Sequence, residues 1–140
     1  MIKISEAASL ALHTMVFLSS EKGKLVSARE IAGELNVSEA HLAKVLQRLA
    51  RSGLLNSVRG PKGGFALSDQ YNELTLLEIY ESIEGPLDKT NCFRSTRACN
   101  GEHCIFGGLL GDINKQVRRY LEATRLPDLT GVIGGTNGGA

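Results

Sequence analysis

The 140-residue sequence lacks an apolar run long enough to cross a membrane. Its longest apolar stretch near the start, residues 10–18, is interrupted by His13 and Thr14, whereas a bilayer span needs about 18 to 20 apolar residues. The stretch also has no basic flank and no small-residue cleavage site of the kind that a secretory signal carries. We therefore expect a cytoplasmic protein that makes no contact with a membrane.

Sequence patterns typical of catalysis are also missing. The chain contains no phosphate-binding loop, no paired carboxylates and no recognisable nucleophile with a neighbouring base. The formal net charge is only +1, so the overall charge does not indicate a polyanionic partner. The sequence predicts a protein that is not an enzyme, and any binding of nucleic acid must depend on where the charges lie.

Cysteine is scarce, and its three copies are bunched at Cys92, Cys99 and Cys104. An odd number of cysteines in one loop does not suit a disulfide framework, but three thiolates suit zinc or the iron of an iron–sulfur cluster. A thiol-based redox switch and three inert thiols are the alternatives. Residues 86–104 show little apolar periodicity. We therefore expect a loop that is not held in place by a hydrophobic core and needs another source of order.

The first half of the sequence carries a helix-turn-helix pattern. A helix over residues 6–20 is followed by a short helix that a capping box at Ser27 opens, a turn at Asn36, and a third helix that Ser38 caps. The third helix has an i, i+3, i+4, i+7 apolar stripe of Leu42, Val45, Leu46 and Leu49. This is the arrangement whose second helix enters the major groove of DNA.

Two short apolar strands, predicted within residues 54–67, flank a basic, glycine-rich segment and predict a hairpin. A capping box at Thr75 opens a fourth helix that Gly85 ends. The fold class is therefore mainly α with a small β-hairpin wing. We expect a winged helix-turn-helix domain at 1–85, a cysteine loop at 86–104, a long dimerisation helix at 105–127 that starts near Phe106, and a flexible tail at 128–140.

Cationic residues concentrate in the third helix and the hairpin. Residues 38–64 hold five lysines and arginines against one carboxylate, a local net charge of +4. A solvated helix flank is the alternative reading, but the adjoining basic hairpin favours a DNA-binding surface. The helix residues that we expect at DNA are Ala40, His41, Lys44, Gln47 and Arg48, and the hairpin residues are Arg59 and Lys62, which Pro61 helps to present.

Three cysteines leave a cluster or a zinc ion one ligand short. His103 is next to Cys104, and this adjacency makes simultaneous ligation sterically awkward. His13 shares one helix face with Glu6 and Ser9, at i, i+3 and i+7, and a dimer could bring this face to the partner's cysteine loop. A structural or surface histidine is the alternative, but we expect His13 to be the fourth ligand.

The order of these features, with the hairpin sequence VRGPKGGF at 58–65, resembles the Rrf-type family of bacterial regulators, the IscR, NsrR and RirA group. The resemblance covers about residues 1–130. It implies a homodimer with crossing C-terminal helices, whose cysteine loops hold iron–sulfur clusters that control DNA affinity. It also implies Cys92, Cys99 and Cys104 as cluster ligands, Arg59 and Pro61 as DNA contacts, Ser38 and Ala40 at the bases, and a histidine ligand at His13.

Two departures from the family pattern leave the cluster type open. Gly107 occupies the position of a ligand histidine in the cluster-assembly regulator, and Ser9 occupies the position of a carboxylate ligand in other relatives. The spacing of six and four residues between the cysteines also differs from the commonest spacing in the family, so a two-iron and a four-iron cluster both stay open. The sequence therefore does not identify the physiological signal.

We expect a homodimeric repressor that binds a near-palindromic promoter site and senses nitric oxide, iron or redox state through its cluster. The first alternative keeps the DNA binding and replaces the cluster with a thiol–disulfide or zinc switch. The second alternative is a cluster-carrying scaffold or enzyme that does not read DNA. The target genes, and whether the loaded or the stripped form binds DNA, stay open.

Overall fold

The computed structural model describes residues 4–21, 23–87 and 105–133, which form a mainly helical fold with one two-stranded hairpin. This confirms the predicted fold class. The elements in chain order are α1 (Glu6–Ser20), α2 (Ala28–Leu35), α3 (Glu39–Arg51), β1 (Leu55–Val58), β2 (Gly64–Leu67), the 3-10 helix η1 (Tyr71–Glu73), α4 (Leu76–Glu84), α5 (Leu109–Ala123) and the 3-10 helix η2 (Leu126–Leu129).

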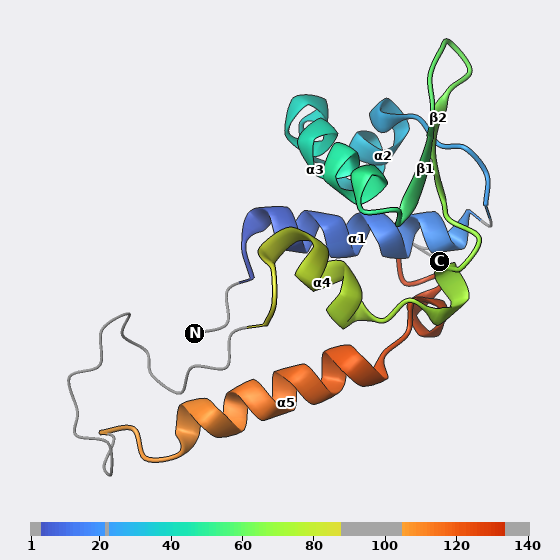
Figure 1. The fold of residues 1–140 in the computed structure, drawn as a ribbon. Helices are drawn as coiled ribbons and strands as arrows, with labels where there is room; N and C mark the ends of the chain where they lie inside the picture. Colours follow the sequence, from blue (N-terminus) through green and yellow to red (C-terminus); the bar gives the residue numbers. More distant parts are fainter. Residues whose placement is uncertain (1–3, 22, 88–104, 134–140) are drawn as a thin grey trace.

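Helix α1 is the centre of the fold. It lies between the helix-turn-helix above it and α4 below it in Figure 1, and it contacts α2, α3, β2, α4 and η2. Ala8, Ala11 and Met15 on α1 are fully buried, because the helix packs against elements on several sides. Its bounds match the prediction, and Ser5 caps it by accepting a hydrogen bond from the backbone N–H of Ala8.

The helix-turn-helix forms as predicted. Asn36 ends α2 in the left-handed conformation with φ 55°, and Ser38 then caps α3 by accepting from the backbone N–H of His41 at 3.1 Å. The apolar stripe of α3 is buried against the core. Only half of the expected capping box at Ser27 is present: Ser27 accepts from the backbone N–H of Glu30, but the Glu30 carboxylate accepts from the Ser27 hydroxyl instead of the Ser27 backbone.

The hairpin pairs β1 and β2 in antiparallel register from Leu55 opposite Leu67 to Val58 opposite Gly64. Its strands agree with the prediction to within one residue. Sequence reasoning missed the bridge between Val26 and Phe65, which fastens the hairpin to the segment before α2 through two backbone hydrogen bonds of 2.8 and 2.9 Å. A Cβ atom at Gly64 would lie 2.5 Å from the carbonyl oxygen of Val26, so this bridge requires glycine.

Helix α4 begins at a complete capping box, as predicted. The Thr75 hydroxyl accepts from the Glu78 backbone N–H at 3.2 Å, and the Glu78 carboxylate accepts from the Thr75 N–H at 3.1 Å. The helix ends at Gly85, whose φ of 80° is a left-handed value that glycine adopts without strain.

Helix α5 is shorter than the periodicity from Phe106 predicts. It begins at Leu109, because Gly107 has a φ of 61° and Gly108 occupies the cap position. The helix lies beneath α4 and away from the hairpin (Figure 1), and it buries Leu110 and Leu121.

The segment after α5 differs from both predictions made for it, a helix that continues to 127 and a flexible tail from residue 128 onward, because α5 ends at Ala123. Leu126 is fully buried, and the Thr124–Leu126 segment exchanges two backbone hydrogen bonds, of 3.0 and 2.9 Å, with Leu74 and Leu76. Further on, Thr130 and Gly131 donate hydrogen bonds to Ser19 and Ser20 at the end of α1. Two apolar side chains, Leu126 and Leu129, reach the core and hold residues up to 133 in place. Residues 134–140 lie outside the described residues.

Candidate nucleic-acid interface

The outward face of α3 carries small and cationic side chains. Ala40, Lys44, Gln47 and Arg51 are all exposed. The buried stripe of α3 fixes the opposite side of the helix in the core, so these residues point to solvent from a rigid element. A small side chain such as Ala40 allows close approach of a partner, and the long side chains around it can reach phosphates or base edges.

Two residues of the predicted DNA-binding flank also contact the protein itself. The imidazole Nε2 of His41 lies 3.7 Å from the carboxylate of Glu6 on α1. The guanidinium of Arg48 donates a hydrogen bond of 2.6 Å to the backbone carbonyl oxygen of Ile83, in the last turn of α4. A helical wheel places both residues on one flank of α3 but gives no information about partners that are distant in sequence.

The tip of the hairpin presents Arg59, Pro61 and Lys62, all of them exposed. Gly60, with a φ of 111°, and a hydrogen bond of 2.9 Å from the Gly63 N–H to the Gly60 carbonyl oxygen close the turn. Within the part of the chain that the structure describes, no carboxylate forms a salt bridge with either cation of the tip. The two charges are therefore available to an external anion.

The hairpin and α3 carry exposed cations on the same side of the molecule. Helix α3 contacts β1, and both elements lie on the same side of α1, opposite α5 (Figure 1). The exposed cations Lys44, Arg51, Arg59 and Lys62 belong to this surface, which we call the α3–wing surface. Since the surface combines positive charge with a protruding helix and hairpin, its shape and charge suit the grooves and phosphates of duplex DNA.

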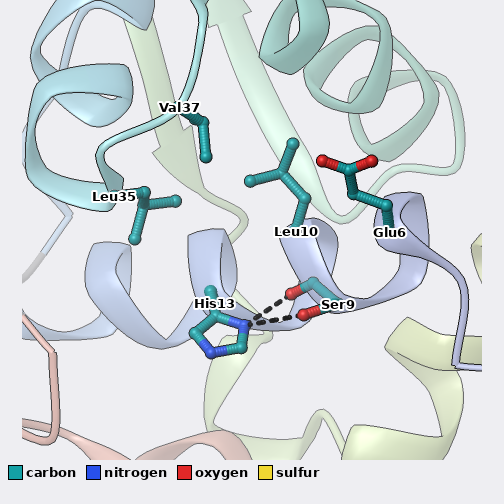
Figure 2. Close-up of a pocket in the computed structure, with 6 residues that line it drawn as sticks. All are labelled: Glu6, Ser9, Leu10, His13, Leu35 and Val37. Atoms are coloured by element: carbon teal, nitrogen blue, oxygen red, sulfur yellow. Dashed lines mark hydrogen bonds between the residues drawn. The ribbon is translucent and has the colours of Figure 1, made fainter.

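A second feature is a pocket of about 250 Å³ between α1 and the turn that joins α2 to α3. Figure 2 shows His13 and Ser9 on α1, with Leu35 and Val37 opposite them. Glu6, Ser9 and His13 line the same pocket, which confirms that they share one helix face.

His13 is exposed, and its ring is oriented by its own helix. Its Nδ1 atom lies 2.6 Å from the backbone carbonyl oxygen of Ser9, and because a carbonyl oxygen only accepts, Nδ1 carries the hydrogen. In the neutral ring with this tautomer, the lone pair is on Nε2. Metal-binding histidines commonly have this arrangement, in which one ring nitrogen donates to a carbonyl and the other binds the metal.

The predicted ligands Cys92, Cys99 and Cys104, and also His103, lie outside the described residues. Among residues 4–21, 23–87 and 105–133, no three histidine, cysteine or acidic side chains gather in a group that could hold a metal ion. The same ranges contain no helix with the length and apolar character of a membrane span.

Apolar side chains are exposed on the flank of α5 that lies next to its buried stripe. Leu109, Ile113 and Tyr120 follow each other at steps of four and seven residues and expose 52%, 38% and 57% of their surface. We call these three residues the α5 stripe. An exposed apolar helix face of this kind is typical of a contact with another protein chain.

The helices α2 and α3 and the adjoining hairpin define a winged helix-turn-helix protein. Residues 4–131 match the Rrf2 family, described as iron-dependent transcriptional regulators, and the chain belongs to this family. The predicted resemblance is therefore confirmed. Because the family consists of transcriptional regulators, the chain is a regulator and not an enzyme, as predicted.

Individual relatives agree with this assignment. The chain is 28% identical to the regulator IscR of Photorhabdus laumondii over 114 residues, covering 81% of this chain and 69% of the relative. It is 28% identical to the regulator NsrR of Bacillus licheniformis over 127 residues, covering 86% and 85%. Among solved structures, CymR, the global cysteine regulator of B. subtilis, superposes with a TM-score of 0.75 at 28% identity, covering 94% of this chain and 98% of CymR.

Proposed function

We propose that the protein is a cytoplasmic, homodimeric transcriptional repressor that binds a near-palindromic promoter site and senses nitric oxide, iron or redox state through an iron–sulfur cluster. The observation that carries this proposal is the α3–wing surface in a chain of the Rrf2 family. This surface supplies the DNA contact, and the family description as iron-dependent regulators supports an iron-based signal.

In this proposal α3 enters the major groove and the hairpin tip reaches the adjacent minor groove. Ser38 and Ala40 lie at the bases, and the Gln47 amide is suited to hydrogen bonding with a base edge. Phosphate contacts come from His41, Lys44 and Arg48 on the helix. At the tip, Arg59 enters the minor groove, and Pro61 and Lys62 contact the backbone.

The cluster is held by Cys92, Cys99 and Cys104 of one protomer and, in our proposal, by His13 of the other. The orientation of His13 fits this role, because its Nδ1–H donates to Ser9 and leaves Nε2 for a metal ion. Its exposure makes the ring accessible to a second chain. When bound, the cluster would supply an iron-based group whose loss or oxidation changes the DNA affinity of the protein. Four protein ligands are compatible with both a two-iron and a four-iron cluster.

The dimer in this proposal forms through the α5 stripe. Its three apolar side chains would leave water if the same face of a second α5 packed against them. A two-fold dimer places two α3 helices on the same side of the duplex, about one helical turn apart, which matches a near-palindromic site.

A second candidate keeps the DNA binding but uses the cysteines directly, in a thiol–disulfide or zinc switch. The similarity to CymR, which is described as a cysteine regulator, favours this candidate. The two candidates differ in iron content and in the number of free thiols after exposure to an oxidant.

Anaerobic purification followed by absorption spectroscopy and iron and sulfide counting tests the proposal. We expect a brown protein with iron and sulfide in it, which binds the promoter duplex. His13→Ala should release the cluster faster than the wild type, and His41→Ala, a matched exposed histidine, should not. A colourless protein that contains no iron contradicts the cluster, and unchanged cluster stability in His13→Ala contradicts the fourth ligand.

A further inference from the structure

Three helices meet at a small group of polar contacts on the side of the molecule where α1 begins and α4 ends (Figure 1). Ser5, the cap of α1, donates a hydrogen bond to the carboxylate of Glu84 in α4. Glu6 on α1 pairs with His41 on α3, and Arg48 on α3 donates to the carbonyl oxygen of Ile83 in α4. We call these six residues the junction; its three contacts join each of the three helices to the other two.

The contact between Arg48 and Ile83 has a clear physical basis. The last four carbonyl groups of an α-helix have no partner within the helix, and the carbonyl of Ile83 is one of these in α4. The partial negative charge of a helix C-terminus attracts a cation, and the hydrogen bond of 2.6 Å satisfies an otherwise open acceptor. Arg48 therefore fixes the last turn of α4 relative to α3.

The last turn of α4 is also the start of the segment that leads to the cysteines. The carboxylate of Glu81 accepts a hydrogen bond of 2.7 Å from the backbone N–H of Leu87, and the Leu87 side chain is buried. These contacts fix the chain after Gly85 to α4. Cys92 follows Leu87 by five residues in the sequence. The route from the DNA-reading helix to the first cysteine thus runs through Arg48, Ile83 and Leu87.

From this geometry we infer that Arg48 is a positioning residue, which couples the orientation of α3 to the conformation of the segment that enters the cysteine region. The inference rests on the proposed function, because it assumes that the state of the cysteines controls DNA affinity. A guanidinium has five N–H donors, so one can hold Ile83 while others face a phosphate. A displacement of Leu87 would then move the end of α4 and, through Arg48, the recognition helix.

The matched variants Arg48→Gln and Arg51→Gln separate this role from a phosphate contact. Both remove one cation from an exposed position of α3, but only Arg48 has a hydrogen bond to α4. The measurement is the affinity for promoter duplex of loaded and stripped protein, as a function of salt. We expect the ratio of the two affinities, about tenfold in the wild type as for typical coupled sites, to fall to about one in Arg48→Gln. Arg51→Gln should keep the ratio and weaken both forms equally.

A third variant, Glu81→Ala, lies away from the α3–wing surface. It removes the acceptor of the Leu87 N–H, so it should also abolish the affinity ratio while leaving the affinity of one form unchanged. If Arg48→Gln weakens both forms equally and reduces the salt dependence as Arg51→Gln does, Arg48 acts only as a phosphate contact and the inference is wrong.

Hydrogen exchange distinguishes failure of the inference from failure of the proposed function. In cluster-free protein, Arg48→Gln should speed exchange of the amides in residues 81–87, and Arg51→Gln should not. DNA should slow exchange there in the wild type and in Arg51→Gln, and not in Arg48→Gln. A wild type whose affinity is the same in both states contradicts the proposed function, whereas exchange in residues 81–87 that is insensitive to Arg48→Gln contradicts the positioning role.

Discussion

Helices α3 and α5 have similar lengths, 13 and 15 residues, and each buries one side in the same protein, but their exposed sides differ. The exposed side of α3 combines small residues with cations such as Lys44 and Arg51, and that of α5 carries the apolar α5 stripe. Burial of one side explains why each helix forms. The chemistry of the other side indicates the partner: a duplex for α3 and a second protein chain for α5.

The largest expected effect comes from placing a charge in the α5 stripe, because it removes the apolar character that distinguishes α5 from α3. Ile113→Glu should convert the proposed dimer to a monomer, because a carboxylate would be buried without a partner at the interface. Loss of the second DNA-binding head should weaken promoter binding by about 100-fold or more. Analytical ultracentrifugation and duplex titration measure both effects.

The control for this variant is Lys115→Gln, which makes the same change in net charge on another face of α5. It should stay dimeric and bind as the wild type does. A dimeric Ile113→Glu protein would show that the α5 stripe is not the dimer contact.

The geometry of the hairpin, which lies beside α3, can be tested by substituting a glycine. Gly64→Ala would place a Cβ atom 2.5 Å from the Val26 carbonyl oxygen, and we expect a loss of about 1–3 kcal/mol in the free energy of unfolding. Gly33→Ala meets no atom within 4 Å and lies in α2, where alanine should stabilise the helix by about 0.5–1 kcal/mol. Urea unfolding compares the two, and equal effects would contradict the close approach at Gly64.

The expected DNA contact of the hairpin tip can be tested at Arg59. Arg59→Ala should weaken promoter binding about tenfold and reduce the salt slope by about one, because it removes one contact with the DNA backbone or groove. Its stability should not change, since the side chain is exposed. Fluorescence anisotropy at several salt concentrations measures the slope, and Lys115→Ala on α5 should leave it unaltered.

The smallest expected effect is at the cap of α3. Ser38→Ala removes the acceptor for the His41 backbone N–H and should lower the free energy of unfolding by about 1 kcal/mol. Ser57→Ala, at an exposed position of β1, should change it by much less. Thermal unfolding of both variants checks this, and equal melting temperatures would show that the cap contributes nothing.

Local sequence signals predicted the elements well, because caps and apolar periodicity act within one turn. The bounds of α1, the cap at Ser38 and the complete capping box at Thr75 all depend on neighbouring residues. The start of α5 was predicted too early, since its apolar periodicity extends across Gly107 and Gly108, which do not continue a helix.

Contacts between distant residues could not be predicted in this way. The hydrogen bond from Arg48 to Ile83 joins residues 35 positions apart, and Thr130 and Ser19 are 111 positions apart. The helix predicted to continue to 127 concealed the anchoring role of Leu126. Tertiary packing, rather than a local pattern, determines each of these contacts.

The most direct test of the account is the affinity of wild-type protein for a near-palindromic duplex selected from a random pool, measured against salt in loaded and stripped forms. The account predicts that at least one form prefers the selected duplex over an unrelated one. It also predicts that the logarithm of its affinity falls steeply and linearly with the logarithm of salt concentration. Equal, weak binding of both duplexes at low salt, in both forms, would contradict it.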